Sequence, residues 1–147
     1  MIGWSMNVVA VAIGGGLGAL GRYGLTLLCT QPPLSRFISG IGNLVGGGAS
    51  FATTVANLLG CLLLGLLYQW TETLAAAGQT PLSPRMMLAI RVGFLGSLTT
   101  FSTLVGDSAV LGTEGRAGAS LTLMAVNLIG GGALFLLGAA SVRGMLS

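Results

Sequence analysis

Four long apolar runs dominate this sequence, and they constrain its fold more than any other feature. They cover residues 6–28, 51–68, 86–111 and 120–140. A helix needs about 20 mostly apolar residues to cross the hydrocarbon core of a bilayer. All the prolines fall in the connections between the runs, where they do not interrupt a helix: Pro32, Pro33, Pro81 and Pro84. The sequence predicts an all-α integral membrane protein with four transmembrane helices, forming a single domain over residues 1–147.

The composition supports a membrane protein and argues against several other classes. Charged residues make up 6% of the chain and hydrophobic residues 53%, whereas a soluble domain carries about 25% charge. The chain has no lysine and no histidine, and its six arginines form no basic patch. It therefore lacks the nucleophile–base pairs and the histidine-rich clusters on which many enzymes and metal sites depend. We expect neither an enzyme nor a nucleic-acid-binding protein.

The arginines are balanced between the two sides of the predicted membrane domain. With four spans, the two termini and the connection 69–85 share one side, and the connections 29–50 and 112–119 share the other. Each side then receives three arginines: Arg85, Arg91 and Arg143 on the first, and Arg22, Arg36 and Arg116 on the second. The positive-inside rule gives no preferred orientation. Either another signal overrides a weak bias, or the chain inserts both ways and forms an antiparallel, dual-topology homodimer.

Polar side chains inside the apolar runs are the first candidate site residues. Thr53 and Asn57 are four residues apart and share a helix face, and Asn127 stands in a similar setting in the last run. An amide inside a membrane needs a hydrogen-bond partner or contact with water. Each asparagine therefore either makes an interhelical hydrogen bond or lines a pore and donates to an anion.

The first run combines small residues with one arginine. Gly14 and Gly18 are four residues apart, a spacing that predicts close packing against a neighbouring helix. Arg22 follows on the next turn. Its side chain either extends to the membrane surface or lines a wet vestibule and attracts anions.

The third run contains the most unusual stretch, GSLTTFSTLVGD at residues 96–107. Five hydroxyl side chains surround Phe101: Ser97, Thr99, Thr100, Ser102 and Thr103. This cluster predicts a third helix that is broken in mid-membrane, which is tolerated only where the backbone is buried or lines a cavity. Exposed carbonyls at such a break can hold a cation, and exposed N–H groups favour an anion. Phe101 either packs in the core or turns its positive ring edge towards an anion.

The positions of the acidic residues help to judge two other classes of small membrane protein, a proton-coupled exporter and a non-transporting subunit. Glu72, Asp107 and Glu114 are the only acids, and the predicted boundaries place none of them at the centre of a span. A small proton-coupled multidrug exporter needs a carboxylate inside the membrane, so this alternative is disfavoured. The other alternative, a non-transporting subunit of a membrane assembly, explains the glycines but leaves the hydroxyl cluster unexplained.

Three motifs follow one another along nearly the whole chain. GGxxGAxxRY is matched by Gly14, Gly15, Gly18, Ala19, Arg22 and Tyr23. GTxxxNxxG is matched at Thr53, Asn57 and Gly60, and GFxGxxTTFST at Gly93, Phe94, Gly96 and residues 99–103. In these motifs the chain resembles the Fluc (CrcB) family of fluoride channels.

The resemblance implies a fluoride-selective channel in the bacterial inner membrane that lets fluoride leave the cytoplasm passively. It implies an antiparallel, dual-topology homodimer with two pores. It also implies a structural sodium ion at the dimer centre, held by the backbone carbonyls of Gly96 and Thr99 of both subunits. The implied fluoride pathway uses Asn57, the edge of Phe101 and the hydroxyls of Ser102 and Thr103. Thr53, Asn127 and Arg22 complete our set of candidate pathway residues.

The chain departs from the family pattern at several positions. Leu104 stands where the family usually has a second Phe, and Ala52 precedes Thr53 in place of Gly. Asp107 replaces a common Glu. In the last run, Leu123 and Asn127 replace a Tyr and a Ser, so that Asn127 can supply the polar donor while Leu123 cannot supply a hydroxyl.

Overall fold

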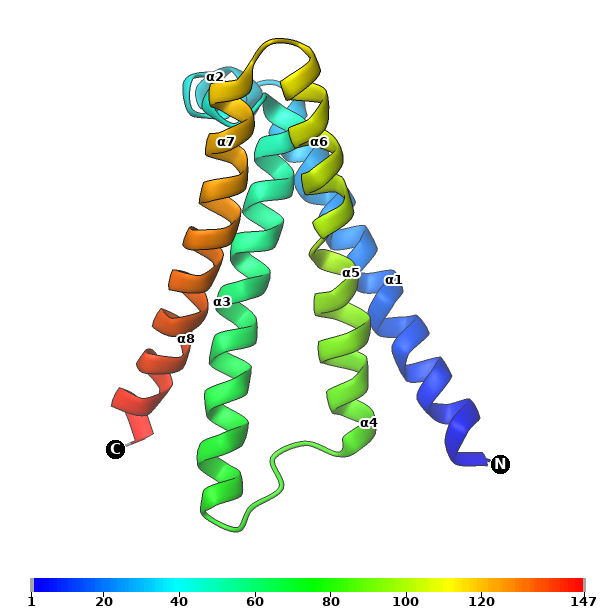
Figure 1. Ribbon diagram of the computed structural model, residues 1–147. Helices are drawn as coiled ribbons and strands as arrows, with labels where there is room; N and C mark the ends of the chain where they lie inside the picture. The colour runs from blue at the N-terminus through cyan, green and yellow to red at the C-terminus, as the bar shows by residue number, and fades with distance from the viewer. Residues whose placement is uncertain (1, 147) are drawn as a thin grey trace.

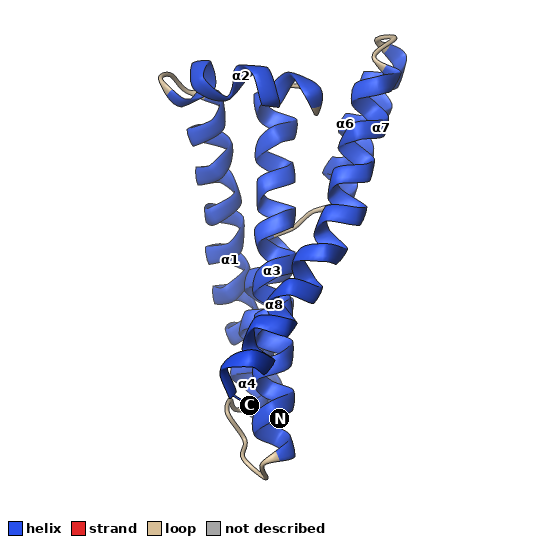
Figure 2. Cartoon of the chain, turned by 90° about the vertical axis from the view of Figure 1, so that its left-hand side faces the viewer, coloured by secondary structure: helices blue, strands red, loops and turns tan. Residues whose placement is uncertain are grey.

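The computed structural model describes residues 2–146, and every regular element in that part of the chain is a helix (Figure 2). Four helical stretches are long and apolar enough to cross a membrane: Trp4–Thr30, Gly48–Ala76, Pro84–Thr113 and Ala117–Met145. The expectation of four spans is thereby confirmed, and the chain is a multi-pass membrane protein.

The first two spans are continuous helices, and the last two are each assembled from several segments. Helix α1 covers Ile2–Thr30, α2 covers Leu34–Leu44 and α3 covers Gly48–Ala76. The third span runs through α4 (Pro84–Met87), the π-helix η1 (Leu88–Leu95), α5 (Gly96–Leu98) and α6 (Phe101–Thr113). The fourth runs through α7 (Ala117–Ala125), the π-helix η2 (Val126–Gly130) and α8 (Gly131–Leu146). Such π-helical turns occur mostly at functional sites.

The helices extend beyond the predicted spans. Helix α3 continues to Ala76, so the prediction of a connection at 69–85 is wrong for its first eight residues. Hydropathy marks the apolar part of a helix, whereas backbone hydrogen bonds carry the helix on into the polar region. Similarly, the first connection, predicted at 29–50, contains a helix of its own, α2.

The spans are arranged so that alternate connections lie at opposite ends (Figure 1). The two termini and the α3–α4 connection lie at the lower end, whereas α2 and the α6–α7 turn lie at the upper end. Along the length of the molecule, α1 packs against η1 and α5, and α3 packs against α8. Helices α6 and α7 lean away from α1 and α3 towards the upper end (Figure 2).

Glycines allow these helix pairs to approach closely. A Cβ atom at Gly14 would overlap the carbonyl oxygen of Ala89, and one at Gly18 would overlap the carbonyl oxygen of Phe94. The small-residue face predicted for the first helix is therefore confirmed as a contact surface. Gly65 of α3 meets the backbone of Phe135 in the same way, so the α3–α8 pair also depends on a missing side chain.

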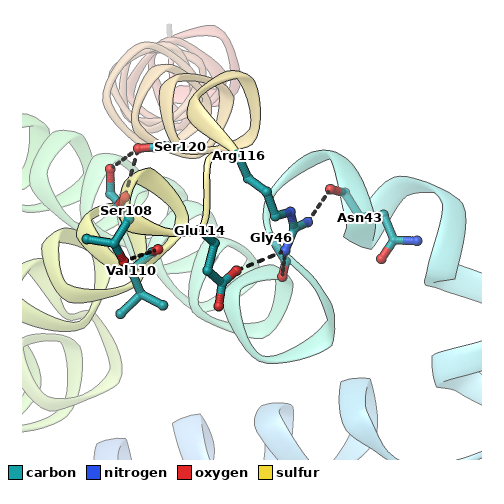
Figure 3. Close-up of polar contacts among 8 residues, drawn as sticks. Asn43, Gly46, Ser108, Val110, Glu114, Arg116 and Ser120 are labelled. Atoms are coloured by element: carbon teal, nitrogen blue, oxygen red, sulfur yellow. Dashed lines mark hydrogen bonds and ion pairs between the residues drawn. The ribbon is translucent and has the colours of Figure 1, made fainter.

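Polar contacts tie the upper ends of the helices together (Figure 3). Arg116, in the α6–α7 turn, donates from Nη2 to the Asn43 carbonyl at 3.3 Å and from Nη1 to the Gly46 carbonyl at 3.4 Å. The hydroxyls of Ser108 and Ser120 lie 2.7 Å apart, joining α6 to α7. An apolar core of Val45, Leu104, Leu111 and Leu123 packs among the same elements.

Candidate functional site: a polar cleft beside Asn57

The third span loses its helical backbone at Thr99 and Thr100. Thr99 has φ −86° and ψ 155°, and Thr100 has φ −153° and ψ 116°, so both residues are extended. Helix α6 then restarts at Phe101, with Thr100 as its N-cap: the Thr103 N–H donates to Thr100 Oγ1 at 3.2 Å. The two extended residues lie within the stretch that the sequence singled out for its hydroxyls.

Asn57 of α3 pairs with the backbone at this interruption. The Thr100 N–H donates to Asn57 Oδ1 at 2.8 Å, and Asn57 Nδ2 donates to the Thr100 carbonyl at 3.3 Å. The same Nδ2 donates to Asn127 Oδ1 at 2.8 Å. The sequence left two interpretations open for Asn57, an interhelical hydrogen bond or a pore-lining donor. The structure shows the interhelical hydrogen bond. The amide oxygen thus replaces the acceptor that a continuous helix would have given the Thr100 N–H, and the amide nitrogen adds a donor to the Thr100 carbonyl.

Asn127, on η2, continues this network into the fourth span. Its Nδ2 donates to Thr54 Oγ1 at 3.1 Å and to the Leu123 carbonyl at 2.9 Å. Thr54 Oγ1 in turn donates to the Ser50 carbonyl at 2.9 Å. Thr54 was missed by the sequence analysis, although it is three residues from Asn57 and so shares the same helix face. Thr53, the candidate chosen instead, is also buried.

A cleft of about 340 Å³ opens beside this network. The α3 residues Asn57, Gly60, Cys61 and Leu64 form one wall. The third span contributes Arg91, Leu95, Gly96, Thr99, Thr100, Phe101 and Leu104, and the fourth contributes Asn127 and Leu128. The structure therefore brings together five of the candidate residues: Asn57, Gly96, Thr99, Phe101 and Asn127. Thr53 and Arg22 do not belong to this lining.

The remaining candidate hydroxyls, Ser102 and Thr103, do not line the cleft but contact Thr100, which does. Ser102 Oγ is 3.3 Å from Thr100 Oγ1, and Thr100 Oγ1 donates to Thr103 Oγ1 at 3.0 Å. Both side chains are exposed, and Phe101 beside them is 67% exposed. A cluster of hydroxyls and one aromatic ring thus faces outwards from the third span.

The carbonyl groups of Gly96 and Thr99 have lost their usual helical donors. In a continuous helix these oxygens would accept from the N–H groups of Thr100 and Thr103. Here Thr100 donates to Asn57 and Thr103 donates to Thr100 Oγ1. The end of α5 thereby presents backbone oxygens beside the cleft, which is the donor type that hard cations prefer.

Arg22 and Arg91, the two arginines that fall inside the predicted apolar runs, differ in position. Arg22 is half-buried on α1, outside the cleft lining, whereas Arg91 is exposed on η1 and lies in that lining. The sequence analysis considered Arg91 only for its charge balance. A charged residue inside an apolar run, five residues before Gly96, could have marked Arg91 as a candidate site residue. The sequence alone did not show which residues surround it.

Two residues that depart from the family pattern, Leu104 and Leu123, pack in the apolar core. Leu104 is only 3% exposed, and Leu123 is fully buried in the same cluster. Leu104 also lines the cleft, whereas Leu123 does not. Leu104 therefore adds an apolar surface to the site.

These features define a class: a multi-pass membrane protein in which three of the four spans build a cleft of amides, hydroxyls and backbone oxygens. Comparison with known sequences narrows the class. Residues 9–139 match the family described as CrcB-like protein, Camphor Resistance (CrcB). The chain belongs to this CrcB family.

Similar proteins from several bacteria align over most of their length. A Rhodopirellula baltica protein named fluoride-specific ion channel FluC is 43% identical over 148 residues, covering 96% of this chain and 97% of the relative. Proteins of the same name from Salinibacter ruber and Shewanella halifaxensis are 38% and 37% identical. They cover 90% and 83% of this chain, and 93% and 84% of their own lengths.

Proposed function

We propose that this chain forms a fluoride-selective channel through which fluoride leaves the cytoplasm passively. The observation that carries the proposal is the outward-facing cluster of Phe101, Ser102 and Thr103 beside a cleft whose amides belong to Asn57 and Asn127. Fluoride holds its water tightly, so a pore must offer replacement donors that are weak enough to release the ion. The names of the relatives, fluoride-specific ion channel, support the choice of ion.

The hydroxyls and the ring are the groups most available to an ion. Ser102 and Thr103 are exposed and bonded chiefly to Thr100, and the positive edge of Phe101 can face an anion. Both Nδ2 hydrogens of Asn57 already have acceptors, Thr100 and Asn127. Asn57 therefore holds the interruption in shape, and it binds fluoride by exchanging one of these acceptors for the ion.

An antiparallel homodimer with two pores is part of the proposal. The interruption falls about halfway along the span Pro84–Thr113, so we place it at mid-depth in the membrane. Hydroxyls exposed there would face hydrocarbon in a lone subunit, which is unfavourable. A second copy that inserts in the opposite orientation would cover them and enclose a wet path. The balanced arginines are compatible with insertion both ways.

We also propose that sodium binds at the centre of this dimer. The carbonyl oxygens of Gly96 and Thr99 fit such an ion, because their helical donors are engaged elsewhere. When bound, sodium would supply a positive charge beside the fluoride path. The chain's own contribution is to hold these oxygens at the end of α5 through the pairing of Asn57 with Thr100.

The test is fluoride efflux from proteoliposomes, followed with a fluoride electrode and with chloride efflux as the control. A selective channel gives fast fluoride efflux that requires a counter-ion shunt, with little chloride efflux. Absence of fluoride efflux from folded, reconstituted protein would overturn the proposal. Gel filtration with light scattering on the same sample tests the dimer separately.

A further inference from the structure

A second cavity adjoins the polar cleft, and Arg91 lies where the two meet. This second cavity has a volume of about 670 Å³ and is lined by Leu64, Pro84, Met87, Leu88, Arg91 and Val92. Leu64 and Arg91 also line the cleft that contains Asn57. Its other residues of the third span come from α4 and the start of η1, and α4 lies at the lower end of that span (Figure 1), so this cavity lies on the lower side of the cleft.

Arg91 brings the one formal charge to this pair of cavities. Among the described residues, no acidic side chain belongs to either lining. The ion pair described in residues 2–146 is Arg116 with Glu114, in the α6–α7 turn, far along the chain from Arg91. A guanidinium stays charged at any physiological pH, and a charge inside a span is tolerated where it faces a water-filled cavity.

We propose that Arg91 forms an anion-attracting site at the junction of the two cavities. Its fixed positive charge raises the local concentration of small anions in the lower cavity and directs them towards the amides and hydroxyls of the cleft. That fluoride is the anion rests on the proposed function. The site itself rests on the position of Arg91, and it is a different one from the vestibule considered above for Arg22.

Arg85 provides a matched control. It lies in α4, at the same end of the same span, and its Nε donates to Asn7 Oδ1 at 3.5 Å. It belongs to neither lining. Removing its charge lowers the potential at the same end of the molecule but takes no side chain out of either lining.

The first test measures fluoride efflux at low and high ionic strength for the parent chain, Arg91→Gln, Arg91→Lys and Arg85→Gln. At about 0.01 M salt, where screening extends over about 30 Å, we expect Arg91→Gln to slow efflux several-fold. The difference should shrink at about 1 M impermeant salt, where screening acts within about 3 Å. Arg91→Lys should resemble the parent, and Arg85→Gln, which removes a charge from outside both linings, should slow efflux less than Arg91→Gln does. A defect in Arg91→Gln that is equal at both salt concentrations would indicate a structural role and overturn the proposal.

The second test does not depend on transport. Leu64→Cys, made in a chain with Cys29→Ala and Cys61→Ala, places a reactive thiol in the wall shared by both cavities. Its modification by anionic and by cationic methanethiosulfonate reagents reports the local potential. Addition of Arg91→Gln should lower the anionic-to-cationic rate ratio about tenfold, and addition of Arg85→Gln, which lies outside both linings, should lower it much less.

The two tests separate this inference from the proposed function. If the parent chain does not conduct fluoride but Arg91→Gln changes the labelling ratio, the anion-attracting site is supported and the proposed channel function is refuted. If the parent chain conducts fluoride but Arg91→Gln changes neither the efflux nor the labelling ratio, the channel function is supported and the anion-attracting site is refuted.

Discussion

The side-chain amide of Asn57 and the backbone of Thr100 pair edge to edge, with N–H to Oδ1 at 2.8 Å and Nδ2 to carbonyl at 3.3 Å. This pairing joins α3 to the point where the third span leaves the helical conformation. It supplies an acceptor to the Thr100 N–H, which has no helical partner there, and a further donor to the Thr100 carbonyl.

Replacing Asn57 should affect both stability and transport. Asn57→Ala leaves the Thr100 N–H and Asn127 Oδ1 without partners, at a cost of about 1–3 kcal/mol for each buried group. Asn57→Asp places a carboxylate against two acceptors, and it should also abolish fluoride efflux by repelling the anion. Thermal melting in detergent and proteoliposome efflux measure the two effects. Asn43→Asp, at an exposed asparagine of α2, is the control. Unchanged efflux in Asn57→Asp would remove Asn57 from the proposed pathway.

The N-cap at Thr100 can be tested by a conservative pair of substitutions. Thr100→Ala removes the oxygen that accepts from the Thr103 N–H, and we expect a loss of about 1 kcal/mol in stability. Thr100→Ser keeps the acceptor and should restore most of the loss. Melting temperatures of the two variants decide the question, because equal values would show that the cap contributes nothing.

Gly60 controls the position of Thr99. A Cβ atom at Gly60 would overlap the Thr99 methyl group. Thr99 cannot rotate away freely, because its Oγ1 donates to the Leu95 carbonyl at 2.9 Å. We expect Gly60→Ala to displace Thr99 and to reduce fluoride efflux at least several-fold. Gly106→Ala, where an added Cβ meets nothing within 4 Å, should conduct normally, and equal efflux from the two variants would contradict this account.

The packing of α1 against the third span predicts a contrast between two glycines on one helix. Gly18→Ala drives a methyl group into the backbone of Phe94, and overpacking of this kind costs about 1–3 kcal/mol. Gly16 has open space within 4 Å, so Gly16→Ala should be neutral or raise stability by up to about 1 kcal/mol. Melting temperatures in detergent test the contrast. Equal melting temperatures for Gly18→Ala and Gly16→Ala would show that α1 does not pack against the third span as described.

The contacts of Arg116 should matter more than its ion pair. The Arg116–Glu114 distance is 3.7 Å and both side chains are substantially exposed, so Glu114→Gln should change stability by about 0–1 kcal/mol. Arg116→Met also loses the hydrogen bonds to Asn43 and Gly46 at the end of α2 (Figure 3), and it should be clearly the less stable variant. Melting temperatures of the two variants, compared with the parent, provide the measurement.

The sequence by itself determined the properties that depend on composition and periodicity. Apolar runs long enough for a bilayer specified four spans. The glycine spacing identified the packing face that Gly14 and Gly18 form. The hydroxyl cluster marked the stretch in which Thr99 and Thr100 become extended. The family motifs then indicated which of the polar residues to examine.

Tertiary structure alone decided which groups meet. The partners of Asn57 lie 43 and 70 residues away, and Thr54 rather than Thr53 joins them. The packing of the spans placed Arg91 in the cleft lining and left all of α1, with Arg22, outside it. Spacing along one helix fixes which residues share a face, but the direction of that face depends on the packing of all the helices together. For this reason the sequence located the candidate residues, and only the packed structure showed how Asn57 holds the interrupted span and where Arg91 lies.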